Sequence, residues 1–122
     1  MKVTRRFTFE AAHRLEGYDG PCARVHGHSY KVEITLRGPL DGDGMVVDFS
    51  RFKEWGNQVL AGYDHVMLND FMNGEPATAE NMAYNIFESL EALLAVLNEH
   101  YVKVDSVKLW ETENCWVEYN GD

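Results

Sequence analysis

The chain of 122 residues is long enough to bury a core without disulfide staples, so we expect one domain over residues 1–122. Its 20 acidic residues outnumber its 11 basic ones, and the net charge of −9 argues against a nucleic-acid-binding surface. No apolar run approaches membrane-spanning length, and the first residues already alternate like a strand. We therefore expect a cytoplasmic protein without membrane contact.

Alternation of polar and apolar side chains over residues 2–13 predicts a first strand. On this pattern His13 shares the core-facing side of the strand with Phe9 and Ala11. Glycines and a proline then predict a loop over residues 14–25.

A second strand is expected from His26 to about Arg37, because its even positions are apolar and its odd positions are polar. The same parity places His26 and His28 on the inward face. Two polar rings in line with a core face require a specific reason, and a bound metal ion would supply one. The apolar positions are Tyr30, Val32, Ile34 and Leu36.

Turn-forming residues over 38–44 predict a hairpin that leads into a short third strand over 45–48. Asp48 or Ser50 should then cap a first helix with an apolar stripe. The stripe consists of Phe49, Phe52, Val59 and Leu60.

Residues 61–77 carry no clear pattern, and a long helix should begin after Thr78 as N-cap and end near Asn98. Residues 101–111 and 115–119 predict two closing strands. The order of three strands, two helices and two strands indicates an α+β fold with an antiparallel sheet and helices on one face. The other face and the edges of this sheet are unaccounted for, which points to oligomerisation.

Three histidines therefore stand on core faces, and they become neighbours if the first two strands pair antiparallel. Three neutral imidazoles that leave a fourth position open are typical of a catalytic zinc site. Iron, nickel and copper also accept imidazole, so zinc is a preference. The alternative for each of the three is a satisfied core or loop histidine. The histidines are His13, His26 and His28.

The two cysteines are too few for a disulfide scaffold. Cys22 lies four residues before His26, close enough to stand over the metal, where a dication would favour its thiolate. The competing interpretation makes Cys22 a zinc ligand. Cys115 falls in an apolar strand and is expected to pack in the core.

Two further groups could carry acid–base or binding chemistry. Asp64 and His65 are adjacent, and a carboxylate that holds an imidazole in one tautomer makes a proton shuttle near neutral pH. Glu111 has the parity of Val107 and Leu109, so its carboxylate should point inward. It would either form a structural ion pair or bind the N–H groups of a ligand.

An ordered set of motifs over nearly the whole chain resembles the 6-pyruvoyl-tetrahydropterin synthase superfamily. The gap of three residues between Cys22 and His26 is more similar to its 6-carboxy-5,6,7,8-tetrahydropterin synthase branch. The motifs are Phe9-Glu10-Ala11-Ala12-His13, Cys22-x3-His26-Gly27-His28, Val47-Asp48-Phe49, Asp64-His65 followed by Leu68-Asn69, Thr78-x-Glu80-Asn81, and Glu111-Thr112.

The resemblance implies the tunnelling fold, a four-stranded antiparallel sheet with two helices on one face. Such subunits assemble through their sheets into oligomeric barrels with active sites between subunits, so a homo-oligomer is expected, with a hexamer favoured. It also implies that His13, His26 and His28 bind Zn²⁺ and that the Cys22 thiol transfers protons.

The remaining site residues follow from the same resemblance. Asp64 and His65 would form a second acid–base group, supplied by a neighbouring subunit. Glu111 would grip the ring N–H and the exocyclic amine of a pterin, helped by Thr112 and by the backbone near Thr78.

The implied reaction converts 7,8-dihydroneopterin triphosphate to 6-carboxytetrahydropterin, with release of acetaldehyde and triphosphate, in the queuosine and 7-deazaguanine pathway. Formation of a pyruvoyl-tetrahydropterin, sepiapterin cleavage and non-catalytic binding of metal or pterin are the alternatives. Two departures from the family pattern concern the substrate rim: Ala77 stands between Pro76 and Thr78, and Tyr63 precedes Asp64 where leucine is common.

Overall fold

The structure is a computed structural model that describes residues 1–15, 17 and 20–122. Part of the loop expected over 14–25 therefore lies outside the described residues. The elements, in chain order, are β1 (Lys2–His13), the 3-10 turn η1 (Pro21–Ala23), β2 (His26–Arg37), α1 (Phe49–Leu60), the 3-10 turn η2 (Ala61–Tyr63), β3 (Val66–Met67), α2 (Leu68–Phe71), α3 (Ala79–Val96), β4 (Lys103–Thr112) and β5 (Cys115–Tyr119).

The strands form one sheet in the order β3-β1-β2-β4-β5. The four longer strands pair antiparallel, as expected, while the two-residue β3 joins the edge of β1 in parallel. The register of β1 against β2 sets His13 opposite His26 and Ala11 opposite His28. Side chains alternate across a strand, so this register alone brings the three histidines to one end of one face.

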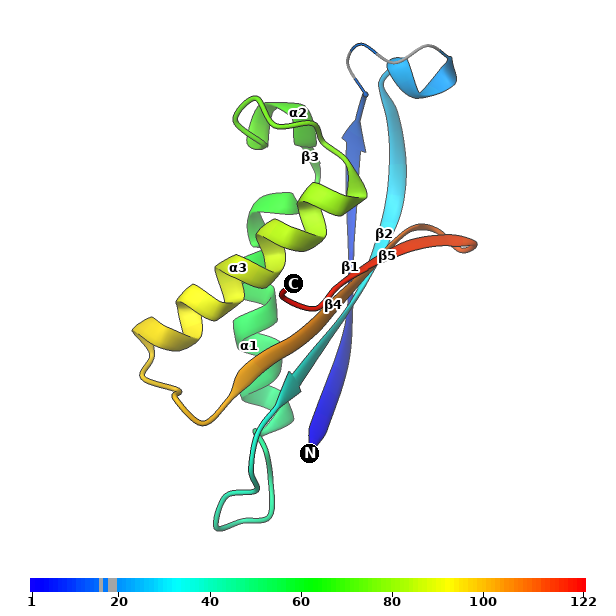
Figure 1. Ribbon diagram of the computed structural model, residues 1–122. Coiled ribbons are helices and arrows are strands. Elements are labelled where there is room, and N and C mark those ends of the chain that lie inside the picture. Colours follow the sequence, from blue (N-terminus) through cyan, green and yellow to red (C-terminus); the bar gives the residue numbers. More distant parts are fainter. Residues whose placement is uncertain (16, 18–19) are drawn as a thin grey trace.

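Helices α1 and α3 lie on the same face of the sheet, and no helix formed by the described residues covers the opposite face (Figure 1). One apolar cluster fills the space between the helices α1 and α3 and the sheet. Burial of that shared apolar surface holds the two layers together. The α+β class and the position of the helices are confirmed.

The third strand expected over 45–48 is wrong, and so is the hairpin leading into it. Asp41 closes a local turn instead: its Oδ1 accepts N–H bonds from Asp43 at 2.8 Å and Met45 at 3.0 Å, and its own N–H donates to the Met45 carbonyl at 2.8 Å. Both backbone polar groups of Met45, the first residue of the expected strand, are thus bonded within the turn. Asp48 then caps α1 by accepting the Ser50 N–H at 2.7 Å.

The segment 61–77 is more ordered than its composition indicates, because it holds η2, β3 and α2. These elements are two to four residues long, too short to show a period in the sequence. They owe their order to tertiary contacts with β1, where Val66 pairs with Ala11 and Met67 pairs with Ala12.

The expected N-cap of α3 is confirmed, since the Thr78 hydroxyl accepts the Asn81 N–H at 3.2 Å. Two side chains expected in the core lie outside it. Cys115 is exposed at the start of the edge strand β5, and Phe49 is exposed in the first turn of α1. In the described part of the chain, no helix has both the length and the apolarity needed to cross a membrane.

Candidate metal centre

The three core-face histidines converge, as expected from the strand pattern. One ring nitrogen from each lies within 4.8 Å of the others, a spacing that a single metal ion can bridge. The ring centroids are 4.6 Å apart for His13 and His26, 5.0 Å for His13 and His28, and 4.8 Å for His26 and His28. His13 is almost completely buried, and the other two are half-buried at the rim.

Backbone carbonyls fix the tautomers of two rings. Nδ1 of His13 lies 2.7 Å from the Ala77 carbonyl oxygen, and Nδ1 of His26 lies 2.7 Å from that of Arg24. A carbonyl only accepts, so each Nδ1 carries the proton and each Nε2 presents a free lone pair. Nε2 of His13 and Nε2 of His28 are buried without a hydrogen-bond partner, a costly state that a bound cation would relieve.

The electrostatics of His28 favour the neutral ring that a metal needs. Its pKa is lowered, first by burial; the Glu111 charge opposes this, and the neighbouring rings of His13 and His26 add to the lowering. The donor set therefore fits a metal ion by the convergence of its three nitrogens and by the tautomers of two rings, and the lowered pKa of His28 agrees with this. Three imidazoles suit several transition metals, so the chemistry of the donors does not select one.

Glu111 faces this centre from β4, on the inward side that its parity predicts. Its Oε1 lies 3.0 Å from Nε2 of His13 and 3.5 Å from Nε2 of His28. With Nε2 of His13 unprotonated, a carboxylate oxygen and a ring lone pair oppose each other, which also favours a cation at this point. The same carboxylate borders a hollow of about 210 Å³ on its other side. That hollow is lined by Ala79, Glu80, Glu111, Cys115, Trp116 and Val117.

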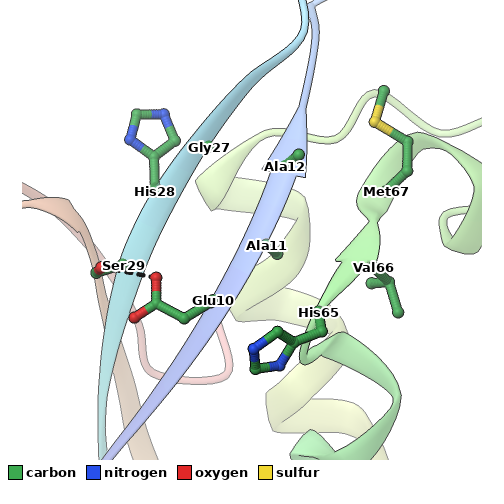
Figure 2. A pocket seen from close by; sticks show the side chains of 9 residues that line it. All are labelled: Glu10, Ala11, Ala12, Gly27, His28, Ser29, His65, Val66 and Met67. Carbon is green, nitrogen blue, oxygen red and sulfur yellow. Dashed lines mark hydrogen bonds between the residues drawn. The ribbon is translucent and has the colours of Figure 1, made fainter.

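A second concavity, of about 500 Å³, runs across β1 between β2 and β3. Figure 2 shows His28 on β2 and His65 beside β3, at its two sides. Glu10 lies between them and accepts the Ser29 hydroxyl at 2.7 Å. The strand pattern does not single out Glu10 or Ser29 as site residues, because polar residues on an outward strand face are ordinary.

The adjacent pair Asp64 and His65 is bonded: Asp64 Oδ2 lies 2.9 Å from His65 Nδ1. The other oxygen of Asp64 accepts the Glu10 N–H at 2.9 Å. These bonds, that of Glu10 first and that of His65 after it, lower the pKa of Asp64 and keep it ionised near neutral pH. His65 has a φ of 57°, a left-handed conformation that is uncommon outside glycine and is often found at functional sites.

Cys22 lies in η1, half-buried, directly before β2. Its carbonyl accepts the Leu15 N–H at 2.8 Å. Asn69 anchors the start of the same loop, since its side chain bonds both the N–H and the carbonyl of Arg14 at 2.9 Å. Within the described residues, no hydrogen bond joins the Cys22 thiol to the histidines. Thr112 is exposed at the end of β4.

Comparison with known proteins places this geometry in a family. The model of the 6-pyruvoyl tetrahydropterin synthase family matches residues 2–122. The 6-carboxy-5,6,7,8-tetrahydropterin synthase of Haemophilus influenzae is 32% identical over 144 residues, covering 98% of each chain. The 6-pyruvoyl tetrahydrobiopterin synthase of Drosophila melanogaster is 34% identical over 136 residues, which cover 98% of this chain and 79% of the fly protein.

Among solved structures, the 6-pyruvoyl tetrahydropterin synthase of Caenorhabditis elegans superposes with a TM-score of 0.87 at 30% identity, over 100% of this chain and 96% of the nematode chain. Fold and site together define a pterin synthase of the tunnelling fold, as the motifs imply. The chain belongs to the 6-pyruvoyl tetrahydropterin synthase family and is an enzyme of that family.

Proposed function

We propose that this enzyme is a zinc-dependent 6-carboxy-5,6,7,8-tetrahydropterin synthase. It would convert 7,8-dihydroneopterin triphosphate to 6-carboxytetrahydropterin, releasing acetaldehyde and triphosphate, in the queuosine and 7-deazaguanine pathway. The observation that carries the proposal is the convergence of three histidine nitrogens on one point, two of them with their tautomers held by backbone carbonyls. Relatives that carry this name, such as the one in Haemophilus influenzae, align over almost the whole chain.

His13, His26 and His28 would hold the metal through one ring nitrogen each. A bound Zn²⁺ supplies Lewis-acid chemistry and a template for the side-chain oxygens of the substrate. The protein orients the rings of His13 and His26 through backbone carbonyls, and it buries His13 away from water.

Two groups would move protons. The Cys22 thiol stands at the entrance to β2, where a nearby dication would favour its thiolate. His65 would serve as the second acid–base group, because the ionised Asp64 holds its Nδ1 and leaves Nε2 to exchange a proton. In the proposed homo-oligomeric barrel, with a hexamer favoured, the Asp64–His65 pair would serve the metal centre of a neighbouring subunit.

Glu111 would bind the pterin ring. A carboxylate accepts two parallel N–H bonds, which suits an amino-substituted heterocycle with adjacent ring N–H and amine groups. The hollow beside Glu111 offers the indole of Trp116 as a stacking surface. Thr112 and the backbone near Thr78 would add polar contacts at the ends of β4 and α3.

Formation of 6-pyruvoyl-tetrahydropterin is the second candidate. Relatives named for the pyruvoyl activity match at 34% and 30% identity, and carboxy-named relatives match at 32% to 37%, so overall identity does not separate the two products. Mass identification of the product from 7,8-dihydroneopterin triphosphate separates them. Release of acetaldehyde supports the carboxy product, and a retained three-carbon side chain overturns it.

The metal and the thiol are tested by two variants. Wild type should hold about one zinc per chain, and His28→Ala should hold none, because two imidazoles alone bind weakly. Cys22→Ala should keep its zinc and lose turnover. Loss of zinc from Cys22→Ala would identify the cysteine as a metal ligand. If zinc-loaded wild type forms neither product from 7,8-dihydroneopterin triphosphate, the protein would be a binding protein.

A further inference from the structure

His13, the most deeply buried histidine of the metal centre, is oriented by a backbone carbonyl just before the N-terminus of α3, a segment distant from it in the sequence. Nδ1 of His13 donates to the carbonyl of Ala77 at 2.7 Å, and both residues are fully buried. Ala77 is the residue that interrupts the family's Pro-Thr pair before this helix. The orientation of one ligand ring therefore depends on where the backbone of a single peptide unit lies.

That peptide unit is held from both sides by one residue. The Asn81 side chain donates its Nδ2 to the Pro76 carbonyl at 2.9 Å, immediately before Ala77. The Asn81 backbone N–H donates to the Thr78 hydroxyl at 3.2 Å, immediately after it. Asn81 thus bridges the two ends of a three-residue arch whose middle carbonyl faces His13.

We propose that Asn81 is a positioning residue of the metal centre: it fixes the arch over 76–78, so that the Ala77 carbonyl keeps His13 in the Nδ1–H tautomer with Nε2 aimed at a divalent metal ion. This inference rests on the three-histidine metal site of the proposed function. It adds a residue that touches neither metal nor substrate.

The physical reason lies in the alternatives open to His13. A free imidazole exchanges between two neutral tautomers, and in one of them Nε2 carries a proton and cannot bind a metal. The Ala77 carbonyl removes that tautomer by accepting from Nδ1. If the arch becomes mobile, the Ala77 carbonyl no longer accepts the hydrogen bond from Nδ1 of His13. The ring can then adopt the tautomer with a proton on Nε2, which cannot bind the ion.

Asn81→Asp tests the idea with little change in shape. The ionised aspartate cannot donate to the Pro76 carbonyl, yet a negative charge in the first turn favours the helix, so the fold should persist. The matched control is Asn85→Asp, one turn further along α3. Its amide donates to the Met72 sulfur at 3.9 Å, and among the described residues it has no hydrogen bond to the arch over 76–78. Asn81→Ala serves as a second variant that lacks the new charge.

Two measurements on the full chain give the outcome. Competition with a chromophoric chelator measures the dissociation constant for Zn²⁺. Partners one bond from a ligand change metal affinity 10- to 100-fold, so we expect about 5- to 10-fold weaker binding for Asn81→Asp and Asn81→Ala, acting one step further out. Asn85→Asp should stay within about 2-fold of wild type on the same scale.

The second measurement is nitrogen-15 NMR of the metal-free protein, which reports the tautomer of His13 directly. Wild type and Asn85→Asp should show the Nδ1–H form, and both Asn81 variants should show a mixture. Equal zinc affinity and an unchanged tautomer in the Asn81 variants would overturn the inference and leave the metal site intact. Absence of zinc binding in wild type would overturn the proposed function instead.

Discussion

At the scale of single residues, the decisive atoms are the ring nitrogens that carry no proton. His13 and His26 each lose their tautomeric freedom to a backbone carbonyl at 2.7 Å. The entropic cost of selecting one tautomer therefore falls on folding and does not weaken metal binding. A site with two oriented lone pairs and a neutral His28 should bind a divalent ion more tightly than the same three rings on flexible loops.

The carboxylate of Glu111 gives a residue-scale prediction. Glu111→Gln keeps the shape but replaces two accepting oxygens by one, and hydrogen bonds to charged groups are worth about 1.5–3 kcal/mol, so kcat/KM should fall about 10- to 150-fold. Metal content should remain at the wild-type level. A large loss of bound zinc in this variant would instead identify Glu111 as a fourth ligand, and metal analysis beside steady-state kinetics decides between them.

Asp64 gives a second prediction, on pH. Its pKa is lowered in the folded chain by the Glu10 N–H and by His65, so the folded state favours the charged form. The resulting stability is present above the ordinary pKa of 3.8 and is lost as pH falls through the lower folded value. Urea unfolding at pH 6 and pH 3 should show this acid-dependent loss in wild type and a smaller one in Asp64→Asn. An identical loss in the variant would contradict the assignment.

At the scale of elements, the antiparallel register of β1 and β2 carries the site. His13 faces His26 and Ala11 faces His28, so a slip of one residue in either strand would turn ligands to the opposite face. The long alternating pattern in β2 resists such a slip, because four fully buried apolar side chains would be exposed by it. These are Tyr30, Val32, Ile34 and Leu36.

Packing of α1 on β1 gives the third prediction. A Cβ at Gly56 would lie 2.1 Å from the ring of Phe7, well inside contact distance. Alanine gains about 1 kcal/mol in helix propensity over glycine, but overpacking costs about 1–3 kcal/mol, so Gly56→Ala should be destabilising overall. Chemical denaturation measures the difference. Gly42→Ala, whose Cβ would meet nothing within 4 Å, is the neutral control.

At the scale of the whole molecule, metal binding and folding are coupled, because the three ligands come from two strands joined by a loop. An ion that binds only the folded chain raises the free energy of unfolding by about 2.7 kcal/mol when its free concentration is 100 times its dissociation constant. For a domain of this size that corresponds to a rise in Tm of about 10 °C.

Thermal scans with and without excess Zn²⁺ therefore provide the fourth prediction. Wild type should show the rise, and His13→Ala should show none, since its buried site has lost one of three ligands. Gly42→Ala, which touches no part of the site, should respond as wild type does. A rise of equal size in His13→Ala would place the stabilising ion elsewhere on the chain.

Much of the fold was predictable from the sequence, and the reason is the length of its periodic segments. The strands over 2–13 and 26–37 and the helix capped by Thr78 each show many repeats of one period, so local pattern and tertiary structure agree. The prediction of a strand over 45–48 was wrong because Asp41 closes a turn onto Met45, and a run as short as Met45-Val46-Val47 shows no period that distinguishes a turn from a strand. Strand β3 was not predicted, because a segment of two residues shows no period at all.

For the site, the sequence alone determined which histidines face the core, because side-chain parity is a local property of a strand. Only the tertiary structure decided which groups surround them. Ala77 lies 64 positions from His13 in the chain, and Glu111 approaches from β4; parity predicts that Glu111 points inward, but no local pattern shows that either residue meets His13. Parity is set by neighbouring peptide units, whereas the partners of a buried ring are chosen by how helix and sheet pack in three dimensions.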